Sequence, residues 1–271
     1  MPNAREGGRR RARSYDPEKT WNALVGQVGH LRTAVRGLTG EQWKWPSGLG
    51  GWDVRLLVVH VVRQIEAVRL LLEEPEPRAG APLVEPAAWA LGTAALAEQL
   101  DAGTREQEAR TADPLAALDA AAVQLAELHA ETVRPGRLVP APFGPMTASD
   151  FAVTRLVELT VHSDDLARAA GIPVGAHRHA LASAVRVLAD ALALKAPGNS
   201  VEVRVPPYAA VQCVAGPRHT RGTPPNVVET DPTTWLRLAA GRSPWPEELA
   251  AAHVSAGGDR ADLSPYLPVL G

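Results

Sequence analysis

Glu158 and His162 place a carboxylate and an imidazole four residues apart within a strongly helical stretch of the sequence. Residues at i and i+4 lie on the same face of a helix, with their Cβ atoms about 5–6 Å apart. Apolar residues flank both positions, so this face is expected to point toward the core. A buried carboxylate and a buried imidazole are costly unless they are paired. Either the two side chains pair with each other, or a cation binds both.

A third candidate ligand, His60, lies in the middle of an earlier and very apolar helix that Asp53 is expected to cap. A helix that is apolar almost all round belongs in the centre of its domain. We therefore interpret His60, Glu158 and His162 as a metal site between neighbouring helices of a bundle. The alternative is that His60 is an ordinary core histidine and that Glu158 pairs with Arg155 or His162.

Two imidazoles and one carboxylate suit Zn²⁺, although Fe, Ni or Co are also compatible with this set. Three protein ligands leave one coordination position open, as in catalytic zinc sites. Asp165 follows His162 on the same helix. It is expected either to hydrogen-bond a ligand side chain from behind or to face solvent.

Composition limits the classes of function. The chain has 271 residues and a formal net charge of −2, which argues against nucleic acid as the main partner. No run of 18 apolar residues is present, so no membrane span is expected. Cys213 is the only cysteine, which excludes an intrachain disulfide and favours a cytoplasmic location. Residues 1–14 are expected to form a disordered basic tail, with RNA binding by this arm as a less favoured alternative.

Helical patterns dominate the first two-thirds of the chain, and loops rich in Pro and Gly separate them. Loops are expected at 42–48, 75–86 and 135–145. Thr147 and Asp150 form a capping box at the start of the helix that carries Glu158. Beyond the helix that Asp53 caps, helices are expected at about 16–38, 86–100, 104–133 with a break at Pro114, 148–170 and 178–196.

The pattern changes after Pro197 and Gly198. Residues 201–205 alternate with period two, and 209–214, 227–229 and 253–256 are further strand candidates. Asp231 and Pro232 begin a short helix that runs to about Ala240. The sequence thus predicts a two-domain α+β protein, with a helical domain at 15–197 and a small α+β domain at 198–271.

Two segments resemble signatures of one family. Residues 51–61 (GWDVRLLVVHV) resemble a GWxVRDLVAHV motif, and residues 158–167 (ELTVHSDDLA) resemble an ExxVHxxDLA motif. Both are typical of the mycothiol-dependent maleylpyruvate isomerase-like family within the DinB-like metalloenzymes, and the resemblance covers about 15–195. It implies a DinB-like four-helix bundle. It also implies a divalent metal, usually zinc, bound by His60, Glu158 and His162.

One position departs from the first motif. Leu56 stands where the family has Asp, one turn before His60. A polar contact of the family is therefore expected to be missing here.

The C-terminal part resembles the bacterial sterol-carrier-protein-like domain, on the strand at 201–207, the loop 219–225 and the segment 235–242. Within that resemblance Arg242 matches an arginine implicated in activity and is assigned a catalytic role. The alternative is a cation that complements the dipole at a helix C-terminus. His219 and Arg221 are assigned to cofactor binding, although their polar loop can also be a simple turn.

The family uses the small thiol mycothiol as a cosubstrate. Cys213 is expected to be buried and inert, so a reacting thiol has to come from outside. A bound metal would favour its thiolate, which then adds to a small electrophilic substrate for S-transfer or cis-trans isomerisation. Arg242 or Arg221 is expected to anchor a substrate carboxylate. The alternative is a non-enzymatic carrier that binds a lipid or other hydrophobic molecule in the C-terminal domain.

Overall fold

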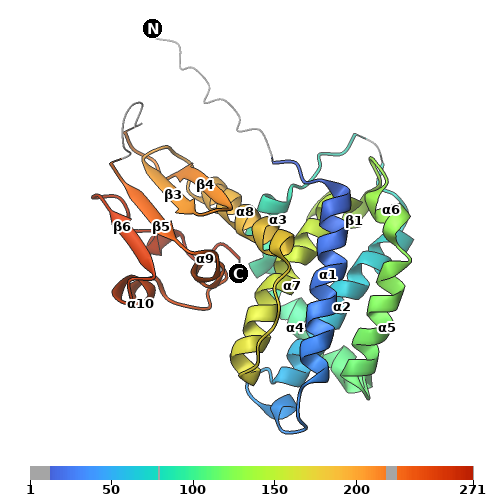
Figure 1. The fold of residues 1–271 in the computed structure, drawn as a ribbon. Helices are drawn as coiled ribbons and strands as arrows, with labels where there is room; N and C mark the ends of the chain where they lie inside the picture. The colour runs from blue at the N-terminus through green and yellow to red at the C-terminus, as the bar shows by residue number, and fades with distance from the viewer. Residues whose placement is uncertain (1–12, 79, 218–224, 271) are drawn as a thin grey trace.

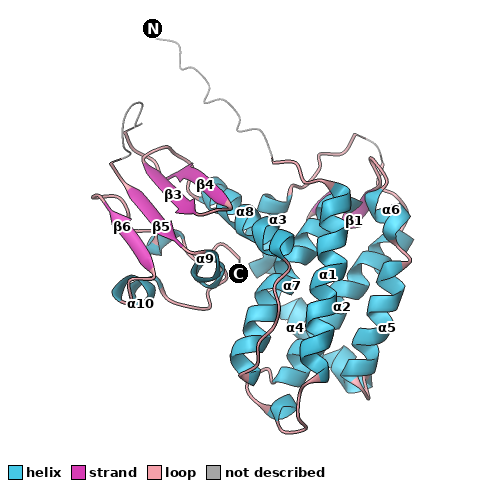
Figure 2. Ribbon diagram, in the orientation of Figure 1, coloured by secondary structure: helices cyan, strands magenta, loops and turns pink. Residues whose placement is uncertain are grey.

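The computed structural model describes residues 13–78, 80–217 and 225–270. Helices fill the N-terminal part of this chain, and a small sheet with two short helices follows them (Figures 1 and 2). The basic tail predicted for residues 1–14 lies outside the described residues except for Arg13 and Ser14. Arg13 Nε lies 2.8 Å from Asp190 Oδ2.

Four helices form the bundle that the sequence predicts. In this bundle α2 packs against α5 and α7, and α1 packs against the same two helices (Figure 1). Their apolar faces meet in a core that excludes water completely at Leu24, Leu57, Leu118 and Leu156. The bounds of the four helices are Pro17–Arg36 for α1, Val54–Glu73 for α2, Pro114–Ala126 for α5 and Ala148–Ala170 for α7.

Side-chain caps set where α2 and α7 begin. Asp53 accepts a hydrogen bond of 2.8 Å from Leu56 N at the start of α2, and Thr147 accepts one of 3.0 Å from Asp150 N at the start of α7. Both caps are those that the sequence predicts. Each satisfies a backbone donor that would otherwise lack a partner and contributes about 0.5–2 kcal/mol. Gly171, with φ of 65°, ends α7 in the left-handed conformation.

The middle helices differ from the prediction. A helix was expected to begin at Thr104, but Thr104 lies inside α4 (Ala97–Arg110), which follows α3 (Pro86–Gly92) and a 3-10 turn. The next helix starts only at Pro114, because Asp113 caps it by accepting from Leu115 N and Ala116 N. A short α6 (His129–Val133) then ends this region. The break at Pro114 is confirmed, whereas the predicted start at Thr104 is wrong.

The loop predicted at 135–145 is also wrong in part, because it holds most of a β-hairpin. Strand β1 (Leu138–Ala141) pairs antiparallel with β2 (Gly144–Thr147). The paired residues Val139 and Met146 are both buried, which anchors the hairpin to the bundle. Proline cannot donate to a ladder, but both strands of an isolated hairpin are edges and tolerate it.

A four-stranded sheet forms the C-terminal part, as predicted, with strand order β4-β3-β5-β6 (Figure 2). Strands β3 and β5 are parallel, and the other neighbouring pairs are antiparallel. The sheet is accompanied by α9 (Pro232–Ala239) and by α10 (Trp245–Ala250), a short helix that the sequence analysis missed. The strand bounds are Val201–Val205 for β3, Ala209–Cys213 for β4, Val227–Thr230 for β5 and Val254–Gly257 for β6.

Helix α8 (Arg178–Lys195) joins the two parts of the chain. It packs against α7 and α1 on one side and against β4 and α9 on the other. The indole Nε1 of Trp235 in α9 donates to the carbonyl of Val185 in α8, at 3.3 Å. Because α8 packs against both parts and their buried residues form one continuous core, the domain boundary near residues 197 and 198 stays a prediction.

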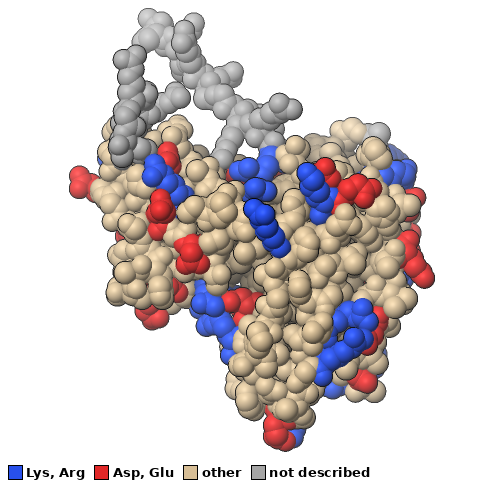
Figure 3. Space-filling model, in the orientation of Figure 1, with Lys and Arg blue, Asp and Glu red and all other residues tan. Residues whose placement is uncertain are grey.

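Charged side chains of both signs are interspersed over the face of the molecule shown in Figure 3. This agrees with the near-neutral net charge of the sequence. Within the described ranges, no helix has both the length and the hydrophobicity needed to cross a bilayer.

Gly198 allows a close backbone approach at the junction. A Cβ at this position would lie 1.9 Å from the carbonyl oxygen of Val214, whereas a Cβ at Gly29 in α1 would meet no atom within 4 Å. We expect Gly198→Ala to lower the free energy of unfolding by about 2–4 kcal/mol, because backbone atoms have to move. Gly29→Ala should raise it by about 0.5–1 kcal/mol. Urea unfolding of both variants measures the effects, and an unchanged midpoint for Gly198→Ala would contradict the packing described.

Candidate metal centre

Three side chains from two helices converge inside the bundle. His60 comes from α2, and Glu158 and His162 come from α7. His60 Nε2 lies 3.6 Å from Glu158 Oε2, and His162 Nε2 lies 3.3 Å from the same oxygen. One potential ligand atom of each residue lies within 4.8 Å of the other two. The three residues that the sequence analysis grouped are therefore neighbours in space.

These spacings suit a divalent ion. Four ligands at about 2.0–2.1 Å in a tetrahedron lie about 3.4 Å from one another. The two nitrogen-to-oxygen distances are close to that value. All three residues are more than nine-tenths buried, so the site is shielded from competition by bulk water.

Thr104 holds the imidazole of His60 from behind. The hydroxyl Oγ1 of Thr104 donates to the carbonyl of Leu100 at 2.7 Å and lies 3.3 Å from His60 Nδ1. Since this hydroxyl has already used its only proton, Nδ1 has to donate to it. The lone pair of His60 is then on Nε2, the nitrogen that faces Glu158.

Asp165 holds the imidazole of His162 in the same way. Its Oδ2 lies 3.0 Å from His162 Nδ1, and Asp165 is only 2% exposed. Of the two alternatives for Asp165, the structure shows the hydrogen bond and not the solvent-facing position. Arg242 in turn donates from Nε to Asp165 Oδ1 at 3.0 Å. The imidazole of His162 is thereby connected to the C-terminal part of the chain.

Of the two alternatives for Arg242, the structure shows the contact with a helix C-terminus. Its Nη1 donates to the carbonyl of Ala240 at the end of α9, at 2.7 Å, and the rest of its guanidinium contacts Asp165. It also lines a polar cavity of about 440 Å³, together with Arg168 and the loop at 46–50. Its assignment as a catalytic residue stays a prediction. His219 and Arg221, assigned to cofactor binding, lie outside the described residues.

Burial and pairing separate the pKa values of the three central groups. Burial lowers the pKa of His60 to about 4. Burial would also lower the pKa of His162, but the hydrogen bonds that its ring donates to Asp165 and Glu158 outweigh burial and raise this pKa to about 9. Burial disfavours the ionised form of Glu158, yet both imidazoles and Arg155 hold its pKa well below the ordinary value. At neutral pH without metal, an anionic Glu158 therefore faces one cationic and one neutral imidazole.

Gln64 and Arg155 belong to this cluster, although the sequence analysis did not assign Gln64 at all and considered Arg155 only as a partner of Glu158. Gln64 Nε2 lies 2.9 Å from His60 Nε2, and Gln64 Oε1 accepts a hydrogen bond from Arg155. Arg155 makes no ion pair within 4 Å among the described residues. Their spacing could have identified them, since Gln64 follows His60 by four residues and Arg155 precedes Glu158 by three, which places each on the same helix face as a candidate ligand.

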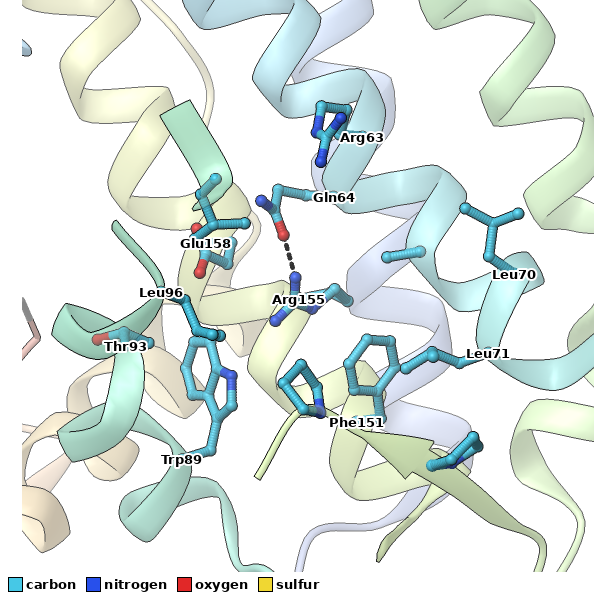
Figure 4. Close-up of a pocket in the computed structure, with 14 residues that line it drawn as sticks. Arg63, Gln64, Leu70, Leu71, Trp89, Thr93, Leu96, Phe151, Arg155 and Glu158 are labelled. Atoms are coloured by element: carbon cyan, nitrogen blue, oxygen red, sulfur yellow. Dashed lines mark hydrogen bonds between the residues drawn. The ribbon is translucent and has the colours of Figure 1, made fainter. Parts of the chain in front are cut away.

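A cavity of about 260 Å³ lies beside Glu158 (Figure 4). Gln64, Arg155 and Glu158 line its polar end. Trp89, Leu71 and Phe151 are among the side chains of its apolar remainder. The centre therefore adjoins a space of the size that a small organic molecule needs.

Together the fold and the site define a four-helix bundle with a candidate metal centre, followed by a small α+β domain. Two family profiles match the chain. The profile for the mycothiol maleylpyruvate isomerase N-terminal domain matches residues 26–167, and that for the bacterial SCP ortholog matches residues 177–269. The chain therefore belongs to the mycothiol-dependent maleylpyruvate isomerase-like family, as its motifs indicated. No curated protein sequence matches it significantly.

Two solved structures are similar to the whole chain. A His-to-Ala mutant of mycothiol-dependent maleylpyruvate isomerase is 17% identical, with a TM-score of 0.56, over 92% of this chain and 95% of that chain. A structure of mycothiol-dependent maleylpyruvate isomerase is 18% identical, with a TM-score of 0.52 and the same coverage. At these identities the comparison establishes the fold, which is the predicted bundle followed by the small α+β domain.

The contact with Asp165 should be visible in the titration of His162. In metal-free protein we expect the imidazole of His162 to titrate near pH 9, as read from its ring C–H signals by NMR. Asp165→Asn should move this pKa toward the ordinary value of 6.5, because the acceptor loses its charge. Asp164→Asn is the matched control, since Asp164 is the neighbour of Asp165 in α7 but pairs with Arg237 of α9.

The same shift affects stability. Since the folded-state pKa of His162 is raised, its stabilising contribution is complete below pH 6.5 and is lost as the pH rises through about 9. We expect the free energy of unfolding of the Asp165→Asn variant to lack this decrease at alkaline pH. An equal titration in both Asn variants would contradict the contact.

Proposed function

We propose that this protein is a divalent-metal-dependent enzyme that activates a low-molecular-weight thiol. The thiolate would serve either S-transfer to a small electrophile or its cis-trans isomerisation. The observation that carries this proposal is the convergence of His60, Glu158 and His162. The hydrogen bonds that the two Nδ1 atoms donate to Thr104 and Asp165 support it, because they leave the Nε2 atoms of His60 and His162 facing Glu158.

The donor set fits zinc best. Two neutral imidazoles and a carboxylate bind Zn²⁺ in many enzymes and leave one coordination position for an exogenous ligand. At this site zinc would supply Lewis acidity, which lowers the pKa of a coordinated thiol. The protein's own residues orient the ligands and exclude water. Glu158 is ionised at neutral pH, so it is already in the form that binds a cation.

The thiol has to be supplied by a second molecule. Cys213 is completely buried in β4, in the sheet and not in the bundle. An external thiolate that adds to a cis-enone converts the double bond to a single bond. Rotation about that bond and elimination of the thiolate then give the trans isomer and return the thiol. In a transferase the adduct is instead the product.

The family supports a mycothiol-like thiol as this cosubstrate. The profile that matches the bundle is named for mycothiol maleylpyruvate isomerase, and both similar structures are of a mycothiol-dependent enzyme. For this chain the identity of the thiol, the metal and the substrate are all part of the proposal.

A carrier function in the C-terminal domain lacks a comparable observation. The apolar side chains of β3 and β4, such as Val203 and Val211, are buried in the protein core. The intervening residues include the charged pair Glu202 and Arg204. Analysis of the purified protein for zinc and for copurifying lipid separates the two functions, since an enzyme should carry the metal and a carrier the lipid.

His60→Ala tests the metal assignment directly. Removing one of three ligands from a buried site should reduce zinc from about one ion per chain to below about one-tenth, as measured by elemental analysis. Metal-dependent conjugation of a thiol to an electrophile should be lost with it. His129→Ala is the control, because this exposed histidine pairs with Glu18 away from the centre. Full zinc occupancy of the His60→Ala variant would reject the assignment.

Zinc binding should also release protons in a defined number. At about pH 7.5 His162 carries a proton to be displaced, whereas His60 and Glu158 do not. We expect release of about one proton per zinc ion, and an affinity that falls about tenfold per pH unit below pH 9. Calorimetry in buffers of different ionisation enthalpy measures this number. Release of two protons, or of none, would show that the protonation states differ from those described.

A further inference from the structure

Arg155 places a guanidinium in the wall of the cavity beside Glu158 (Figure 4). The residue is only 6% exposed. Its Cζ lies 5.3 Å from the ring centre of Trp89 and 4.6 Å from that of Phe151. These two aromatic rings therefore hold the cation where the polar and apolar parts of the cavity meet, next to the candidate metal centre.

No carboxylate forms an ion pair with Arg155 among the described residues. Its Nη1 donates to Gln64 Oε1 and its Nε donates to Thr154 Oγ1, both neutral acceptors. Arg137, the other buried arginine of the described residues, behaves differently, since its Nη1 lies 2.8 Å from a carboxylate oxygen of Glu76. Burying a guanidinium without a directly paired anion is costly. Arg155 therefore offers a buried cation to which an incoming anion can bind.

The charge of the centre points to the same conclusion. Glu158 is the nearest carboxylate, but two imidazoles already share it, and a divalent ion would use it as a ligand. A divalent cation, one carboxylate and one guanidinium then sum to a charge of +2, with Asp165 balanced by Arg242. One thiolate neutralises half of this charge. The remaining positive charge, at Arg155, matches one further anionic group.

We propose that Arg155 binds the single carboxylate of the electrophilic substrate, whose apolar remainder fills the cavity lined by Trp89, Leu71 and Phe151. This proposal rests on the proposed function for the presence of an electrophilic substrate. It specifies the substrate as a monocarboxylate with a hydrocarbon body. The anchor is thereby placed in the bundle, whereas the sequence analysis expected it at Arg242 or Arg221.

The remaining walls of the cavity disfavour a second negative charge. Leucine, proline and aromatic side chains form most of them. Arg63 also lines the cavity, but it is less buried than Arg155 and its Nη1 donates to the carbonyl of Gly103. A volume of about 260 Å³ is just below the usual range of about 300–1,000 Å³ for ligand pockets, which selects a small molecule.

Binding of two matched, unreactive probes to the zinc-loaded protein tests this proposal. The probes are 3-benzoylpropionate and its neutral amide, which differ only in the charged group. Quenching of tryptophan fluorescence reports binding, since Trp89 lines the cavity. We expect the carboxylate to bind about 10–100-fold more tightly than the amide, as for a hydrogen-bonded charge pair. Arg155→Met should abolish this preference, and Arg155→Lys should retain part of it.

Arg63→Gln is the matched variant at the other arginine of the cavity and should keep the preference for the carboxylate. Equal binding of the two probes to the unchanged protein would overturn the proposal. The proposal would also be overturned if Arg63→Gln lost the preference for the carboxylate probe while Arg155→Met kept it. The zinc content and melting temperature of each variant establish that the centre and the fold are intact.

The outcome also separates this proposal from the proposed function. Thiol conjugation of acidic and neutral electrophiles at equal rates would support the proposed enzyme function and reject the role of Arg155 in substrate binding. The opposite result is a carboxylate preference that depends on Arg155 in a protein without metal-dependent thiol chemistry. That result would support the binding role of Arg155 and reject the proposed enzyme function.

Discussion

The buried carboxylate of Glu158 is the interaction partner on which the polar groups inside the bundle depend. It is 8% exposed, ionised and surrounded by apolar helices, so it requires compensation from within the protein. Imidazoles from both α2 and α7 supply that compensation. The face of α2 that carries His60 accordingly lies against the face of α7 that carries Glu158. The same requirement accounts for the polar residues behind the imidazoles, because Thr104 and Asp165 are needed to orient the rings.

Much of the fold and of the centre follows from short-range rules. Asp53 and Thr147 predict the starts of α2 and α7, because a capping side chain accepts a hydrogen bond from a backbone N–H only two or three residues later. Once both helices begin at known positions, the helical repeat places His60, Glu158 and His162 on inward faces. The β3 strand follows equally directly from its period-two alternation. These predictions depend on interactions between residues that are close in the sequence.

What the sequence analysis missed depends on contacts between distant segments. Thr104 was expected at a helix start, whereas its hydroxyl reaches His60 from the middle of α4. The β1–β2 hairpin forms because Val139 and Met146 find a buried site against the bundle, which local composition rich in proline does not reveal. Arg155 was considered only as a partner for Glu158. Its aromatic neighbour Trp89 comes from α3, and no spacing rule connects the two.

The contact between Arg242 and Asp165 makes the two parts of the chain chemically dependent on each other. All three candidate ligands lie in the bundle, so a fragment ending before the sheet would still contain every donor atom. In such a fragment, however, Asp165 would lose its guanidinium partner and keep only the imidazole of His162. The small sheet therefore does more than follow the bundle along the chain. It completes the electrostatic surroundings of a histidine that lies about eighty residues earlier in the sequence.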